Sequence, residues 1–322
     1  GIYQRVPEWQ LWVCFCNRGY PVFNHGGYCL SSIPHDEAGS RRVLGGIMKT
    51  KKIGKWVSFT LLILLILVFL FPYYVMITGA FKSQMALQLI PPDLNPFRNL
   101  TGKNAAYVWQ KTEILLWLAN STAVSLGTAI ITVFIGATAG YAFAKKRFRG
   151  QELIFALVIA TMLLPRQMLL IPNYLVAMKL HLTNSRIGLI LTTVSPAFGV
   201  FLCRQFMGSI PTELLEAAEI DGCGEIRRFI GIVLPMALPA LGALGIFSFF
   251  SAWNDYLWQL IMIADKGLRT TPIGIALFSQ GQITNTGYQL MAAMIATLPM
   301  LIIFLSCQKF FVKGITIGGV KG

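Results

Sequence analysis

The stretch Pro211–Pro235, PTELLEAAEIDGCGEIRRFIGIVLP, is a charged segment within a sequence that is otherwise strongly apolar. Five of the thirteen acidic residues of the chain fall inside it, at Glu213, Glu216, Glu219, Asp221 and Glu225. The hydrocarbon core of a membrane does not accommodate this density of charge, because ionised side chains are costly there. We therefore expect the segment to lie in water between two membrane-spanning helices.

The rest of the chain has the composition of a polytopic membrane protein. Hydrophobic residues make up 55% of the 322 residues and charged residues 12%, against about 25% charged in an ordinary soluble domain. A span needs about 20 apolar residues, and several charge-free runs exceed this length. We predict an all-α polytopic membrane fold with six transmembrane helices, at about residues 56–78, 116–144, 152–178, 187–206, 230–262 and 288–308.

Two of these predicted spans have local features of their own. The second, at 116–144, is rich in small residues such as Ser121, Gly136 and Gly140. Small residues let helices approach closely in lipid, so we interpret them as bundle packing rather than pore lining. The third contains Pro165, whose missing N–H interrupts a helix. Arg166 follows it, and we interpret this residue as a snorkelling anchor near the outer interface rather than a substrate ligand.

The net charge of +14 is distributed as membrane topology requires, so we do not interpret it as nucleic-acid binding. Dense clusters of lysine and arginine precede the first predicted span and follow the second, fourth and sixth. The cations on the opposite side are spread over longer loops. Because cytoplasmic loops carry the excess of lysine and arginine, we predict that both termini and the Pro211–Pro235 segment are cytoplasmic.

Residues 1–47 differ in composition from the remainder of the chain. They mix tryptophan, cysteine, glycine and proline without periodicity and lack the apolar stretch of a secretory signal. Met48–Lys52, followed by the first span, looks like a natural start, so we predict that 1–47 are a non-native or disordered extension. A native cytoplasmic tail is the alternative. The spacing of Cys14, Cys16 and Cys29 matches no strong zinc pattern, and no metal site is expected.

The charged segment itself is predicted to form a short helix, a glycine turn and a second helix. A proline at its start suits the first helical turn. Leu214, Leu215 and Ala218 form one apolar stripe, and Gly222 and Gly224 permit a left-handed exit from the helix. An amphipathic helix at the membrane interface is the alternative interpretation. That alternative explains the stripe but not the combined spacing of the alanine pair, the glycine and the Ile-x-Leu-Pro sequence.

This combined spacing resembles the EAA loop of ABC-importer permeases, a cytoplasmic element that docks on the ATP-hydrolysing subunit. The loop would cover residues 209–235. The smooth alanine pair would be gripped by the partner, and the glutamate would pair with a cation there. The residues to which the resemblance gives a role in ATPase coupling are Glu216, Ala217, Ala218, Asp221, Gly222, Ile232, Leu234 and Pro235.

The resemblance extends over residues 48–322, which look like the second membrane subunit of a carbohydrate ABC importer of the maltose and glycerol-phosphate type. Phe201–Phe206 and Trp253–Trp258 are similar to stretches of that family, although Gln259 stands where many relatives have proline. The family fold is that of a type I ABC importer permease. The family's C-terminal tail would correspond to residues 309–322, with contacts to the ATPase subunits implied for Lys313, Gly314, Gly319 and Lys321.

The resemblance also implies partners and a location. A solute-binding protein outside the cytoplasmic membrane of a bacterium or archaeon would deliver a sugar to a pore formed with a second permease, most simply as a heterodimer. Two ATP-binding subunits would bind ATP and Mg and drive the cycle. This lipid-embedded chain would do no covalent chemistry, so no enzyme activity, catalytic residue or cofactor of its own is expected. It has no Walker-type glycine-rich loop.

Trp253, Asn254 and Asp255 are candidates for the translocation path. An intramembrane carboxylate is a functional candidate by default. The alternative is that Asn254 and Asp255 stabilise a bend or the outer end of the fifth span.

Two other functions compete with the importer. An ion-coupled secondary transporter usually shows repeated halves and several intramembrane ionisable groups, whereas this chain offers one clear candidate, Asp255. A membrane docking or scaffold subunit would use the Pro211–Pro235 segment as a binding element only.

Overall fold

The computed structural model describes residues 37–280 and 285–319, and the side chains of 56–278 and 285–308 within them. Across these ranges the regular structure is helical apart from one isolated bridge between Lys82 and Leu100, as the predicted all-α class requires. The chain divides into two units, 1–68 and 69–322. The second unit contains the helix bundle and every site described below.

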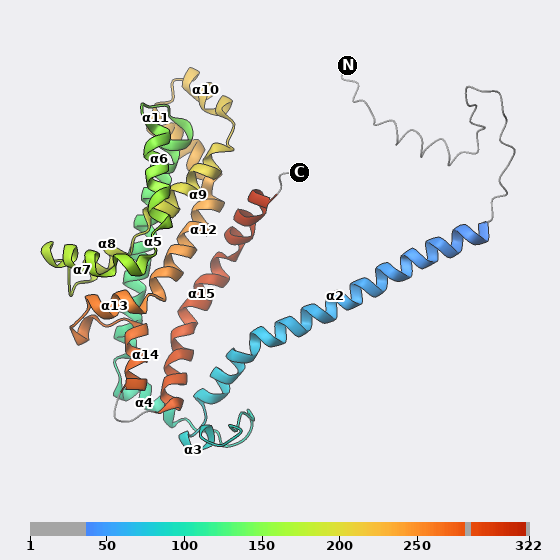
Figure 1. Ribbon diagram of the computed structural model, residues 1–322, viewed down its shortest axis with the longest axis vertical. Coiled ribbons are helices and arrows are strands. Elements are labelled where there is room, and N and C mark those ends of the chain that lie inside the picture. The colour runs from blue at the N-terminus through green and yellow to red at the C-terminus, as the bar shows by residue number, and fades with distance from the viewer. Residues whose placement is uncertain (1–36, 281–284, 320–322) are drawn as a thin grey trace. The chain divides into compact units, whose positions relative to one another are not determined.

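In chain order the helices are α2 (Glu37–Ala80), α3 (Gln84–Leu87), α4 (Lys103–Lys111), α5 (Ile114–Lys145), α6 (Gln151–Ala160), η1 (Thr161–Leu163), η2 (Arg166–Leu169), α7 (Leu170–Lys179), α8 (Arg186–Thr193), α9 (Pro196–Gly208), α10 (Thr212–Ile220), α11 (Glu225–Arg228), the π-helical η3 (Phe229–Val233), α12 (Leu234–Trp253), α13 (Tyr256–Met262), η4 (Lys266–Leu268), α14 (Thr271–Gln280) and α15 (Thr286–Gly319). Most of the described connections between helices are short, and the one from α3 to α4 is longer and covers residues 88–102 (Figure 1).

Four helical stretches of the described chain are long and apolar enough to cross a membrane. They are Trp56–Ala80, Ile114–Lys145, Glu225–Trp253 and Thr286–Gln308. Two bent pairs bring the number to six if each pair counts as one span. The predicted count of six therefore depends on α6–η1 with η2–α7, and on α8 with α9.

The predicted span boundaries differ from the structure at the helix breaks. The third span turns by 93° after Leu163, and the fourth by 48° after Thr193. The fifth, predicted as one helix over 230–262, ends at Trp253 and resumes as α13. The predicted tail at 309–322 is helical as far as Gly319, because α15 continues beyond the apolar stretch.

The N-terminal boundary predicted at Met48 falls inside α2 and not between two helices. Residues 37–47, assigned to the extension, form the first turns of α2, while residues 1–36 lie outside the described ranges. The start of the native chain at Met48 stays a prediction.

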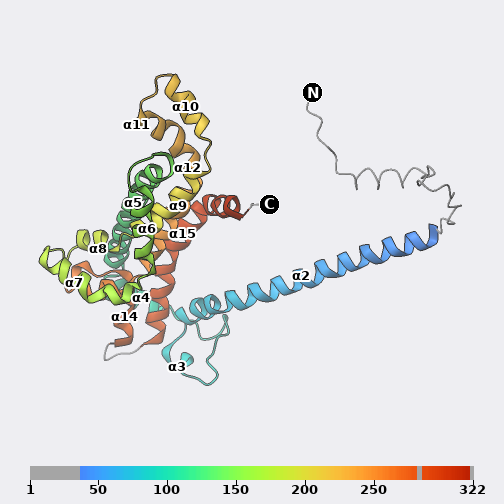
Figure 2. The same ribbon diagram turned by 45° about the horizontal axis from the view of Figure 1, so that its top comes forward.

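Close packing of α5 against α9 and α12 forms the centre of the bundle (Figures 1 and 2). A Cβ placed on Gly140 would lie 2.4 Å from the Cβ of Cys203, and one on Gly136 would lie 3.0 Å from the carbonyl carbon of Gly199. Neither position has room for a side chain. The small residues of the second predicted span thus serve helix packing, as predicted, and Ser121 is likewise buried.

The two ends of the bundle carry different elements. Figures 1 and 2 show α10 and α11 together at one end and α4 at the opposite end, with α7 and α8 extending to the side between them. The sideways direction of α7 follows from the 93° turn after η1. The bundle therefore presents one polar loop at an end and one group of bent helices along its side.

Candidate functional site

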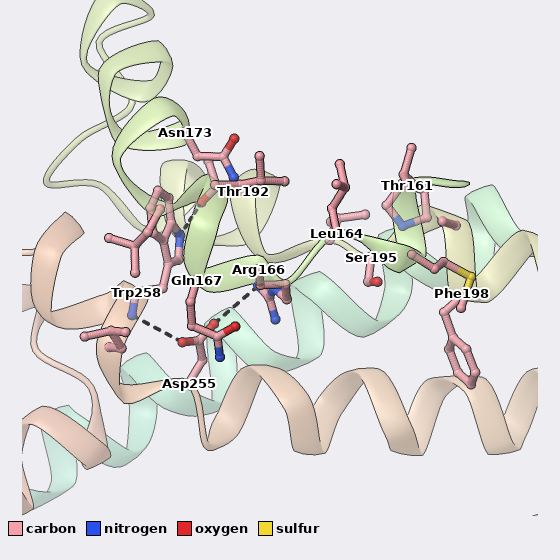
Figure 3. Close-up of a pocket in the computed structure, with 17 residues that line it drawn as sticks. Thr161, Leu164, Arg166, Gln167, Asn173, Thr192, Ser195, Phe198, Asp255 and Trp258 are labelled. Atoms are coloured by element: carbon pink, nitrogen blue, oxygen red, sulfur yellow. Dashed lines mark hydrogen bonds and ion pairs between the residues drawn. The ribbon is translucent and has the colours of Figure 1, made fainter. Parts of the chain in front are cut away.

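Three helix breaks meet at one pocket with a mixed polar and apolar lining, which has a volume of about 450 Å³ (Figure 3). The breaks separate η1 from η2, α8 from α9, and α12 from α13. Pro165 and Pro196 stand at the first two, where a residue without an N–H cannot continue a regular helix. Each break contributes residues to the lining, so segments distant in sequence form a single wall.

Asp255 lies at the break between α12 and α13 and faces the break between η1 and η2. Its Oδ1 accepts a hydrogen bond of 3.3 Å from the backbone N–H of Trp258, which caps α13, and its Oδ2 lies 3.4 Å from Nη2 of Arg166. The Asp255 side chain is 14% exposed and that of Arg166 is 56% exposed. Asp255 therefore stabilises a bend, as the alternative interpretation held, and it also lines the pocket. Arg166 is an ion-pair partner there.

Gln259 bridges the same break from the inside. Its side chain is buried, its Nε2 donates a hydrogen bond of 2.8 Å to the carbonyl of Ala252, and its Oε1 accepts one from Thr270. A proline at this position would supply neither bond. The residue that departs from the family pattern thus joins the end of α12 to α13.

The three residues predicted for a translocation path have different surroundings. Asp255 lines the pocket, whereas Trp253 is buried and stacks on Phe249 with ring centroids 5.5 Å apart. Asn254 is exposed and donates to the carbonyl of Phe250. Trp258, which was part of the family resemblance only, lines the pocket and donates from Nε1 to Oγ1 of Thr192 at 2.8 Å.

The remaining polar lining is available for new contacts. Gln167, Asn173 and Ser195 make no side-chain hydrogen bond within the described part of the chain. Among the described lining residues, only Arg166 and Asp255 carry charge, and their formal charges cancel.

A second candidate element is the helix–turn–helix of α10 and α11, which matches the local structure predicted for the charged segment. Gly222 has φ +79°, a left-handed conformation that glycine adopts without strain. The N–H of Cys223 donates to the carbonyl of Ala218, and that of Gly222 to Glu219, so α10 ends in a Schellman motif. Gly224 has φ −65° and precedes α11. The left-handed exit therefore uses Gly222 alone.

The residues predicted to couple to an ATPase divide into exposed and buried groups. Ala218 is buried, whereas Ala217 beside it is exposed, so only one alanine of the pair is accessible to a partner. Ile232 and Leu234 are half-buried and pack on the core of the bundle. The exposed members of the set are Glu216, Ala217, Asp221, Gly222 and Pro235.

Of the predicted tail contacts, Lys313, Gly314 and Gly319 fall within α15. Lys321 lies outside the described residues.

The sequence interpretation missed how this loop is attached to the bundle. The Glu225 carboxylate accepts hydrogen bonds from the Tyr141 hydroxyl at 2.5 Å, from Lys146 Nζ at 2.5 Å and from Arg228 Nη2 at 3.0 Å. Arg228 also pairs with Glu219 of α10. The i, i+3 spacing of Glu225 and Arg228 was a signal in the sequence for one of these contacts.

Lys145 adds a second attachment between the end of α5 and the loop. Its Nζ donates a hydrogen bond of 2.5 Å to the carbonyl of Ile210, just before α10. In the sequence, Lys145 and Lys146 indicated topology only. In the structure they bind the loop to α5.

The comparison with known proteins assigns the family. A family model described as a binding-protein-dependent transport system inner membrane component matches residues 132–317, which include both the pocket and the α10–α11 loop. The chain belongs to this family. It is a multi-pass membrane permease, and its four long apolar helices agree with that assignment.

Relatives of this permease include permease subunits named for oligosaccharides and for glycerol phosphate. It is 33% identical to the arabinooligosaccharides transport system permease protein AraQ of Bacillus subtilis, over 80% of this chain and 93% of the relative. It is 35% identical to the sn-glycerol-3-phosphate transport system permease protein UgpE of Salmonella typhi, over 80% of this chain and 94% of the relative.

A solved structure shows the same fold. A chain of a bacterial ABC transporter involved in the import of the acidic polysaccharide alginate superposes with a TM-score of 0.69 at 22% identity. The superposition covers 81% of this permease and 98% of that chain. The permease therefore has the fold of a type I ABC importer permease.

Proposed function

We propose that this permease is a subunit of an ATP-driven, binding-protein-dependent importer that carries a sugar or sugar derivative across the cytoplasmic membrane. The observation that carries the proposal is the family match over residues 132–317. It is supported by relatives named for arabinooligosaccharides and for glycerol phosphate that span most of the chain.

The assembly we propose contains a second permease, two ATP-binding subunits that bind ATP and Mg, and an extracytoplasmic solute-binding protein. A solved structure of similar fold, of a bacterial alginate ABC transporter, is in complex with an alginate-bound periplasmic protein, with a TM-score of 0.59. The lysine and arginine clusters support an orientation with both termini and the α10–α11 loop in the cytoplasm. The permease transmits motion and lines the path, and the ATP-binding subunits perform the hydrolysis.

In this mechanism, the ATP-binding subunits press on the exposed face of α10, at Glu216 and Ala217. The Glu225 contacts with Tyr141 and Lys146 carry the displacement into α5. The close contact of α5 with α9 then carries it toward the side of the bundle that contains the helix breaks. The C-terminal residues Lys313, Gly314, Gly319 and Lys321 provide a further contact with the ATP-binding subunits.

Uptake by the complete complex in proteoliposomes tests this function. We expect accumulation of labelled sugar that requires ATP and the binding protein and is abolished when the ATP-binding subunits are catalytically inactive. Uptake driven by an ion gradient without ATP would contradict the importer. Stimulated ATP hydrolysis with no uptake of any sugar would instead support a docking subunit.

A further inference from the structure

We propose that the pocket at the three helix breaks holds an uncharged sugar, and that Asp255 sets this preference by neutralising Arg166. The inference rests on the proposed function and specifies its cargo. The relatives do not decide the charge of the cargo, because arabinooligosaccharides are neutral whereas glycerol phosphate and alginate are anions. The pocket itself supplies the discriminating feature.

The charges of the pocket leave no site for an anion. Arg166 and Asp255 are the charged groups among the described lining residues, and their formal charges cancel at a separation of 3.4 Å. A carboxylate or phosphate that bound Arg166 would lie beside the Asp255 carboxylate, and like charges at this distance repel. The anion would also lose its hydration without gaining an unpaired cation. A neutral ligand meets neither penalty.

The uncharged polar groups suit sugar hydroxyls. Gln167 and Asn173 each offer amide donors and an acceptor, Ser195 offers a hydroxyl, and none of the three has a side-chain partner within the described part of the chain. A sugar hydroxyl both donates and accepts, so it pairs with either half of an amide. Leu164 and Phe198 provide apolar surface for the C–H faces of the rings. About 450 Å³ is within the range of small-molecule sites.

The two charged residues differ in how firmly they are held. Asp255 is anchored by its bond to the Trp258 N–H and is mostly buried, whereas Arg166 is more than half exposed and comes from the bent third span. Asp255 is therefore a fixed negative charge, and Arg166 is the group with room to contact a ligand. Neutralising Asp255 would leave an unpaired guanidinium, which binds carboxylates and phosphates well.

Ligand binding to the purified permease–ATPase complex, without the binding protein, tests the proposal. The probes are galactobiose and digalacturonate, which differ only in a CH₂OH or COO⁻ group on each ring, and saturation-transfer NMR in nanodiscs reads weak binding. We expect the wild type to bind galactobiose about tenfold more tightly than digalacturonate. Asp255→Asn should strengthen digalacturonate binding about tenfold and leave galactobiose within about threefold. Asparagine remains a good helix cap, so α13 is preserved.

Two further variants guard against indirect effects. The double variant Arg166→Gln/Asp255→Asn returns the pocket to zero formal charge and should regain the wild-type preference for galactobiose. Glu152→Gln removes an exposed carboxylate of α6, outside the pocket, and should change neither affinity.

Three results overturn the inference: equal or tighter wild-type binding of digalacturonate, an unchanged preference in Asp255→Asn, or no binding of either sugar. Failure of the proposed function is separate, because it appears as absent ATP-driven uptake of any sugar by the complete complex.

Discussion

The α10–α11 end and the pocket at the helix breaks both place charged side chains in an apolar chain, but they pair them differently. Glu225 accepts hydrogen bonds from three side chains, one on α5, one just after the end of α5 and one on α11. Asp255 has one side-chain partner among the described residues, Arg166, at 3.4 Å. Several contacts fix the geometry of the loop, whereas Arg166 has one long contact in the pocket and is able to exchange partners. Under the two proposals above, charge would transmit motion at one region and select a ligand at the other.

The backbone also differs between these two regions, because it is continuous in one and interrupted in the other. From Glu225 to Trp253 the helix is continuous, with a π-helical turn at η3, and α5 contacts α9 at glycines without room for a side chain. Around the pocket three helices are interrupted. A continuous, closely packed group of helices therefore lies beside a group of interrupted helices in one bundle. Variants that change only one of the two groups separate their roles.

The largest effect is expected from Gly140→Leu. The new side chain would start 2.4 Å from the Cβ of Cys203 and 3.0 Å from the backbone nitrogen of Arg204, so α5 and α9 must separate. Overpacking of this kind should cost about 3 kcal/mol of stability and lower the yield of assembled complex. Gly245→Ala is the matched control, because its Cβ would meet Val133 at an ordinary 3.5 Å. An unchanged thermal midpoint for Gly140→Leu would show that the two helices are not in close contact.

Glu225→Ala should have the next largest effect. It removes the acceptor shared by Tyr141, Lys146 and Arg228, and the loss should be about 2 kcal/mol because the site is partly exposed. Import per ATP hydrolysed should fall even in the variant complex that remains folded, since α10 is no longer attached to α5 through this carboxylate. Glu152→Ala breaks an exposed pair with Arg204 and should change stability by less than about 1 kcal/mol. Equal coupling in both variants would remove Glu225 from the transmission route.

Glu216→Lys should leave stability unchanged and still uncouple hydrolysis from import. Glu216 is exposed on α10 and has no salt bridge within the described residues, so the folded chain loses no contact. The expected loss lies at the interface with the ATP-binding subunit and is read as ATPase activity that no longer depends on the binding protein. Gly222→Pro should have the same outcome with some loss of stability, because proline cannot adopt φ +79°. Normal import by Glu216→Lys, with Glu152→Lys as charge-reversal control, would contradict the coupling role.

The sequence predicted the features of this chain that depend on local pattern. Helical class, the approximate apolar stretches and the turn at Gly222 follow from hydropathy and from the conformational freedom of glycine. The break at Pro165 was also visible as a missing N–H. The extent of each bend was not, because a 93° turn depends on what α7 packs against.

The sites show the same division between local and distant contacts. The spacing around Glu216 was legible, whereas the attachment of Glu225 to Tyr141 joins residues 84 positions apart. Arg166 and Asp255 are separated by 89 positions and were interpreted individually. No pattern in one sequence links such pairs. Ala218 shows the limit within a motif, because the alanine pair was visible but not which member is buried.

The smallest effect is expected in the pocket, from Trp258→Phe. Phenylalanine keeps one six-membered ring, while the nitrogen-containing ring of the indole and its 2.8 Å bond from Nε1 to Thr192 are lost, which should cost about 1.5 kcal/mol. Because this bond holds one wall of the pocket against α8, galactobiose binding should weaken about fivefold. Trp253→Phe is the matched control, since that ring lies outside the pocket on Phe249 and should alter stability without altering affinity.

Thr192→Val completes a double-mutant cycle with Trp258→Phe. If the bond positions the wall, the two changes are coupled, and the double variant binds galactobiose no more weakly than the weaker single variant. Fully additive losses would mean that Trp258 and Thr192 act on the sugar separately. In that case the wall of the pocket is not fixed by this pair, and the helices at the breaks are free to move toward the ligand. The pocket would then be held less firmly than the α10–α11 loop.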